Sequence, residues 1–138
     1  MASGDVQHTV ELTTENFDEK VGNDGMILLD FWASWCGPCQ RFGPIYERAA
    51  ERNPDLMFGK VDTEAQPELA GAFEIRSIPT LMIVRDGIVV FGQPGALPEA
   101  ALDELIDKAR ALDMDEVRGK IAAQREENAP AGAASQAS

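Results

Sequence analysis

The 138-residue chain is poor in the side chains that bind metals and form crosslinks, with two cysteines and one histidine. Two cysteines form at most one disulfide, which excludes the densely crosslinked scaffold of small secreted proteins. A structural zinc site usually takes four protein ligands, more than these side chains supply. His8 lies far along the chain from the cysteines, and we expect an ordinary surface residue. The sequence therefore predicts no metal site.

Basic residues are also scarce, because 12 lysines and arginines stand against 24 aspartates and glutamates, a net charge of −12. Such a surface repels nucleic acid and anionic lipid, so we expect neither a nucleic-acid nor a membrane partner. No apolar run approaches the roughly 20 residues that a membrane-spanning helix requires. Residues 1–7 have neither the basic nor the apolar region of a secretory signal. We therefore expect a cytoplasmic protein.

What the chain does have is a pair of cysteines, Cys36 and Cys39, between an apolar stretch and a helical pattern. Residues 26–32 are short and apolar enough for a buried strand, and apolar residues recur at helical spacing after the cysteines. In the first turn of a helix, positions i and i+3 share a face within reach of one S–S bond. Unpaired N–H groups and the helix dipole favour a thiolate there, which would make Cys36 a nucleophile. We expect the Cys36 sulfur to face solvent and the Cys39 sulfur, one turn into the helix, to be shielded.

Two other interpretations of the cysteine pair are a structural disulfide and half of a metal site. A disulfide that closes so short a loop stabilises a fold by only about 2 kcal/mol. A metal site would need ligands that the chain lacks. Redox chemistry is the interpretation that the motif and its flanks favour.

The sequence Trp35-Cys36-Gly37-Pro38-Cys39 resembles the active-site signature of the thioredoxin family. The resemblance covers roughly residues 8–112, and its other segments are Asp30-Phe31-Trp32-Ala33, Pro44, Lys60-Val61-Asp62, Ile78-Pro79-Thr80, Asp86-Gly87 and Gly95-Ala96. It implies a thiol–disulfide oxidoreductase that reduces protein disulfides through a reversible Cys36–Cys39 cycle. It also implies disulfide-containing client proteins, recycling by an NADPH-dependent thioredoxin reductase, and no bound cofactor beyond the redox-active disulfide. We expect a monomer.

The pattern of apolar residues is compatible with that family's α/β fold, a central mixed β-sheet flanked by helices on both faces. Strands are expected near residues 10–12, 26–32, 56–62, 80–84 and 88–91, and the last two form a hairpin around Asp86-Gly87. Helices are expected after residue 14, from the cysteines to about residue 53, after Pro67, and over residues 97–112.

We expect a flexible lead over residues 1–7, a thioredoxin domain over residues 8–112 and a C-terminal extension over residues 113–138. In the extension, Met114, Val117 and Ile121 predict a short helix with a narrow apolar stripe. The last ten residues are of low complexity and are expected to be disordered. Removal of the extension is expected to leave stability and activity nearly unchanged.

Asp30 is the charged residue of the apolar stretch before the cysteines. Burial disfavours the ionised carboxyl, so its pKa should rise, and it could exchange a proton with the thiol of Cys39. The alternative is a hydrated carboxylate at a frayed strand end. Lys60 lies on the strand expected beside Asp30 and could pair with it and tune the redox site, or could simply face solvent.

The remaining candidate residues surround the sulfur atoms. Ile78-Pro79 implies the cis-proline loop that faces the cysteines in the family, and a strand that begins with proline leaves the Ile78 backbone free to pair with a client segment. Trp35, Ile78, Pro79, Gly95 and Ala96 are the expected substrate-binding residues, although Trp35 could instead pack in the core. Gly37 and Pro38 are expected to tune the redox potential. Gln40 stands where the family commonly has lysine.

Two other functions remain open from the sequence. An oxidase or isomerase of the same fold is disfavoured by the Gly-Pro pair and by the lack of a visible secretory signal. A binding module or holdase would keep its activity without the Cys36 thiol, whereas a reductase would lose it.

Overall fold

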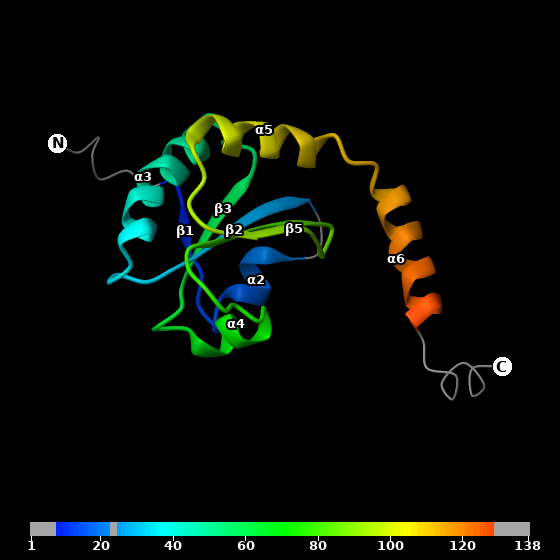
Figure 1. Cartoon of the computed structure of the whole chain (residues 1–138), viewed down its shortest axis with the longest axis horizontal. Coiled ribbons are helices and arrows are strands. Elements are labelled where there is room, and N and C mark those ends of the chain that lie inside the picture. The colour runs from blue at the N-terminus through cyan, green and yellow to red at the C-terminus, as the bar shows by residue number, and fades with distance from the viewer. Residues whose placement is uncertain (1–7, 23–24, 129–138) are drawn as a thin grey trace.

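The computed structural model describes residues 8–22 and 25–128, so the predicted lead and the last ten residues lie outside the described ranges. Five strands form one sheet in the order β1-β3-β2-β4-β5 (Figure 1). Their bounds are β1 Val10–Glu11, β2 Met26–Trp32, β3 Met57–Asp62, β4 Thr80–Arg85 and β5 Ile88–Pro94. The pairs β1–β3 and β2–β3 are parallel, whereas β2–β4 and β4–β5 are antiparallel. The predicted mixed sheet is confirmed.

Helices cover both faces of this sheet, as predicted (Figure 1). On one face, α3 (Gly37–Arg52) and α5 (Glu99–Arg110) pack against Leu28 and its neighbours. On the other, α2 (Phe17–Val21) and α4 (Pro67–Ala72) pack against Leu29 and Phe31. Because side chains alternate along a strand, β2 contributes residues to the hydrophobic cores on both faces of the sheet. It also lies between β3 and β4. The strand that leads to the cysteines is therefore the most enclosed one.

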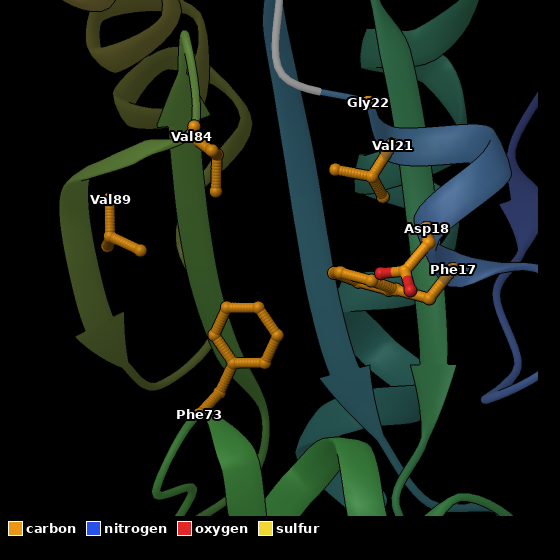
Figure 2. Close-up of a pocket in the computed structure, with 8 residues that line it drawn as sticks. Phe17, Asp18, Val21, Gly22, Phe73, Val84 and Val89 are labelled. Carbon is orange, nitrogen blue, oxygen red and sulfur yellow. The ribbon is translucent and has the colours of Figure 1, made fainter.

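A hollow of about 280 Å³ lies on the α2 and α4 face (Figure 2). Figure 2 shows Val84 and Val89 of the β4–β5 hairpin on one side of it, with Phe17 and Val21 of α2 on the other and Phe73 at one end. It contains neither cysteine. The cysteines lie elsewhere, at the junction of β2 and α3.

Beyond α5, helix α6 spans Met114–Asn128 and extends away from the sheet (Figure 1). Its first residue, Met114, is buried with 6 % exposure. Arg118 pairs with Asp86 in the β4–β5 turn at 3.5 Å. The guanidinium of Arg85 donates to the carbonyls of Ala109 and Leu112 at 3.0 Å each, which satisfies the end of α5. Within the described ranges, no helix has the length and apolar character needed to cross a bilayer.

The predicted boundary at residue 112 stays a prediction, and the burial of Met114 makes it testable. We expect truncation after Leu112 to lower the melting temperature by several degrees, because burying a methionine contributes about 1.5–3 kcal/mol. Truncation after Asn128 should change it by about one degree or less. Scanning calorimetry of both variants beside the full chain measures this. Equal melting temperatures would show that the core ends at Leu112, as the sequence alone suggests.

Candidate active site

Cys36 and Cys39 lie where β2 gives way to α3, and they are joined by a disulfide with the two Cα atoms 5.2 Å apart. The Cys36 N–H donates to the carbonyl of Ala33 at 3.2 Å, which closes the turn between strand and helix. The sulfur atoms pack with Ala33, Trp32 and Ile78. The strand–turn–helix setting predicted for the cysteine pair is confirmed.

Cys36 occupies the N-cap of α3, and its Sγ accepts the backbone N–H of Cys39 at 3.2 Å. A capping atom of this kind satisfies one of the free N–H groups at a helix start. In the reduced protein, the same N–H and the helix dipole would stabilise negative charge on the Cys36 sulfur. Cys39 lies inside the first turn of α3 and is not the N-cap residue. The two sulfurs are therefore electrostatically unequal.

Exposure does not distinguish the two cysteines in this disulfide form, contrary to the expectation that Cys36 is open to solvent and Cys39 shielded. Both residues are buried, with 4 % exposure each. The reason is that Cys36 turns inward to cap α3 and packs against Ile78. Its place at the N-cap, rather than its accessibility, supports the role of nucleophile.

Asp30 is buried as the sequence predicts, with 1 % exposure, and not hydrated at a frayed strand end. Alternation along β2 places its side chain on the face of Leu28, toward α3, the helix that carries Cys39. Neither carboxyl oxygen has a hydrogen-bond partner among the described residues. Burial raises the pKa of Asp30 from 3.8 to about 7, against the opposing charge of Lys60. The carboxyl can therefore gain or lose a proton near neutral pH.

Tyr46 is a second buried titratable group near Asp30. Burial raises the pKa of its hydroxyl well above the ordinary value, and the negative charge of Asp30 adds to the effect. The hydroxyl donates to the carbonyl of Gly59 at 2.7 Å. Because the Tyr46 hydroxyl donates its proton to Gly59, it forms no hydrogen bond with the Asp30 carboxyl.

Lys60 lies opposite Asp30 in the parallel register of β2 and β3. Its ammonium nitrogen sits 4.8 Å from the centre of the Trp32 ring, a cation–π arrangement. No ion pair joins Lys60 to Asp30 within the described ranges. Lys60 therefore acts on the carboxyl through its charge, by favouring the ionised form, and not through a direct contact.

The Ile78–Pro79 peptide bond is cis, as the resemblance implies. The carbonyl oxygen of Ile78 lies 3.8 Å from the Cys36 sulfur. Ile78 precedes β4, and no described residue is hydrogen-bonded to its backbone N–H. A polar backbone edge thus lies free beside the disulfide.

Trp35 is 67 % exposed, so it does not pack in the core. Trp35 and Ile78 line an open hollow of about 220 Å³ beside the disulfide; its other lining residues are Thr63, Ala70, Ile75, Arg76 and Ser77. Gly95 and Ala96 lie outside this hollow. The Gly95 N–H donates to the carbonyl of Pro79 at 2.7 Å, which ties it to the cis-proline loop. Gly37 and Pro38 are exposed in the first turn of α3.

Gln40 and Arg76 lie near the site but are not among the candidate site residues predicted from the sequence. The side-chain N–H of Gln40 donates to the carbonyl of Ser34 at 2.6 Å and ties the first turn of α3 to the loop before Cys36. The only signal was that Gln40 departs from the lysine common in the family. Arg76 lines the hollow beside Trp35 and Ile78. The signal in the sequence is its position just before Ser77-Ile78-Pro79.

Comparison with known proteins agrees with this geometry. The thioredoxin family model matches residues 8–108. A Streptomyces coelicolor protein assigned as a thioredoxin 2 is 69 % identical over 117 residues, which cover 85 % of this chain and 87 % of the relative. The thioredoxin of Listeria monocytogenes is 42 % identical over 99 residues, 71 % of this chain and 95 % of the relative. Thioredoxin C-3 of Corynebacterium nephridii is 40 % identical over 100 residues, 72 % of this chain and 69 % of the relative. The chain belongs to the thioredoxin family and is a thiol–disulfide oxidoreductase that reduces protein disulfides through Cys36 and Cys39.

Proposed function

We propose that Cys36 is the attacking nucleophile of the reduced protein. Its thiolate attacks one sulfur of a client disulfide, forms a mixed disulfide with that sulfur, and releases the other client sulfur as a thiolate. The observation that carries this assignment is the Cys39 N–H directed at the Cys36 sulfur at 3.2 Å from the start of α3. That N–H lowers the free energy of the thiolate relative to the thiol.

Cys39 then resolves the mixed disulfide. Its thiol loses a proton and attacks the Cys36 sulfur, which forms the Cys36–Cys39 disulfide and releases the second client thiolate. The net change is the transfer of two electrons from the dithiol to the client. We assign the proton acceptor as Asp30, because a buried carboxyl with a pKa of about 7 can take up a proton at neutral pH.

The client segment is proposed to lie extended beside the cis-proline loop. The unpaired Ile78 N–H can form a backbone hydrogen bond with it, as in strand addition. Trp35 supplies a large exposed apolar surface next to the disulfide, and Pro79 and Gly95 hold the loop in place. In this arrangement Gly37, Pro38 and Lys60 adjust the redox potential, while Ala96 extends the contact surface.

The oxidised protein is proposed to be recycled in the cytoplasm by an NADPH-dependent thioredoxin reductase, with the protein acting as a monomer. The redox-active group is the Cys36–Cys39 disulfide itself. The reaction is proposed to need no cofactor bound to this chain, since electrons pass from sulfur to sulfur.

A coupled assay tests the proposed function directly. Insulin serves as the disulfide substrate, with thioredoxin reductase and NADPH supplied, and NADPH oxidation is followed by absorbance. We expect continuous turnover that requires all three proteins. Folded protein that gives no turnover, while its disulfide is still reduced by dithiothreitol, would overturn the proposed recycling route. Binding of clients that persists without the thiols would favour a binding module instead.

A further inference from the structure

Helix α3 separates its charged side chains onto two faces. Arg48 and Arg52 face α5, where Arg48 pairs with Glu99 at 3.1 Å, and Arg52 pairs with Glu99 at 2.7 Å and with Asp103 at 2.6 Å. Glu47 and Glu51 are likewise four residues apart, so they share a different face. No basic side chain of the described residues pairs with either of them. Two like charges therefore lie together without a counter-charge.

The segment before β1 brings a third side chain, of a different chemical type, to this face. The backbone N–H of His8 donates to Glu47 Oε2 at 2.5 Å, and the hydroxyl of Thr9 donates to Glu47 Oε1 at 3.0 Å. These bonds fix the orientation of the half-buried Glu47 carboxylate. One imidazole nitrogen of His8, one oxygen of Glu47 and one oxygen of Glu51 all lie within 4.8 Å of one another.

A candidate for a protein counter-charge is Lys60, which lines a hollow together with Thr9, Glu11, Trp32 and Glu47. Its ammonium lies over the Trp32 ring, 4.8 Å from the ring centre, and is not paired with a carboxylate. Two glutamates at positions i and i+4 repel each other and slightly destabilise a helix. A cation held between the two carboxylates would replace this repulsion by attraction and stabilise the helix.

We propose that His8, Glu47 and Glu51 bind one first-row divalent transition-metal ion, with Zn²⁺ as its representative. Three protein ligands of the imidazole and carboxylate type, completed by water, form a known class of zinc site. Imidazole favours zinc, copper and nickel, whereas magnesium and calcium prefer sites made of oxygen alone. The net charge of −12 raises the local concentration of any cation.

The site is separate from the redox pair, although both involve α3. The cysteines occupy its N-terminal turn, while Glu47 and Glu51 lie in its last two turns. A metal ion there ties the segment before β1 to the helix and stabilises the folded chain by mass action. This role adds to the disulfide chemistry and does not depend on it.

Titration of the oxidised full-length protein with ZnCl₂ tests the site, because the disulfide form has no thiol that could bind zinc. Calorimetry should give one equivalent of Zn²⁺. At a free Zn²⁺ concentration about 100 times the Kd, the melting temperature should rise by several degrees. Co²⁺ should give visible absorption bands that report its protein ligands.

Substitutions separate the proposed site from diffuse binding to an acidic surface. His8→Ala removes the imidazole but keeps the backbone N–H bond to Glu47, and both it and Glu51→Gln should weaken Zn²⁺ binding at least tenfold. Glu68→Gln, which removes an equal charge from an exposed position in α4, should bind like the wild type. The proposal is wrong if the wild type takes up no Zn²⁺, if His8→Ala binds it unchanged, or if Mg²⁺ binds as tightly as Zn²⁺.

Discussion

Replacing Cys39 by serine should stop the reaction at the mixed disulfide. The Cys36 thiolate would still attack a client, but no second thiol could displace it, so the covalent adduct should accumulate. Cys36→Ser should give neither adduct nor turnover, because serine is not a nucleophile for disulfides at neutral pH. We expect both variants to lose at least 1,000-fold in insulin reduction. Non-reducing gel electrophoresis and mass spectrometry detect the adduct.

The two variants serve as matched controls for each other, because each removes one sulfur atom from the same buried pair. Circular dichroism should show the same fold for both. An adduct on Cys36→Ser instead of Cys39→Ser would reverse the assigned roles. The structure supports the assignment through the N-cap position of Cys36, since both cysteines have the same 4 % exposure in the disulfide form.

The sequence predicted the sheet and its cysteine junction well because the signals there are local. The apolar stretch before the cysteines, the Asp86-Gly87 turn and the alternation of strands with helices each depend on neighbours in the chain. The burial of Asp30 was also predictable, because a strand that is apolar on both sides leaves no solvent-facing position. The structure places it opposite Lys60 in β3.

The predictions were weaker where packing between distant segments decides the outcome. The apolar residues that mark the last domain helix in the sequence are Leu97, Ala101, Leu105 and Ile106. Of these, Ile106 is fully buried, and Leu97 and Leu105 pack against the core in part. Leu102, the other fully buried residue of α5, is missing from that set. Helix α5 begins only at Glu99, so Leu97 precedes it. The burial of Met114 depends on the path that the chain takes after α5. The spacing of apolar residues along the sequence does not predict that path.

The cluster of His8 with Glu47 and Glu51 could not be found from spacing along the chain. His8 is 39 residues away from Glu47, and only the pairing of β1 with β3 and the packing of α3 bring them together. Metal motifs recognised in sequences have ligands at short, regular spacings. Three ligands from two separated segments fall outside that pattern, which explains why the sequence predicts no metal site.

Asp30→Asn should make the protein more stable near neutral pH and remove one source of its pH dependence. The folded-state pKa of Asp30 is about 7, against an ordinary value of 3.8, so between these values the folded carboxyl keeps a proton that the unfolded one loses. The stability contributed by this proton is present below pH 3.8 and is lost as the pH rises to about 7. One pKa unit corresponds to about 1.4 kcal/mol, so the full effect is at most about 4 kcal/mol.

Urea unfolding of the wild type and Asp30→Asn between pH 4 and pH 9 measures this difference. The advantage of Asp30→Asn should grow from pH 4 to about pH 7 and then stay constant, because the wild-type carboxyl is ionised in both states above that range. Asp18→Asn, at an exposed position in the first turn of α2, is the matched control and should show no such growth. A constant difference across the whole range would show that Asp30 has an ordinary pKa.

The same Asp30→Asn substitution should slow the resolution of the mixed disulfide, because asparagine cannot accept the proton of Cys39. General base catalysis typically contributes at least 100-fold, and we expect a loss of about tenfold or more at pH 7, since hydroxide and buffer replace the carboxylate in part. Single-turnover experiments with acid quenching separate resolution from the first attack, which should keep its rate. The wild-type rate of resolution should rise with pH through about 7 as the carboxyl ionises, and that rise should be absent from Asp30→Asn. An Asp30→Asn variant that resolves at the wild-type rate with the wild-type pH profile would show that the carboxyl takes no part in the chemistry.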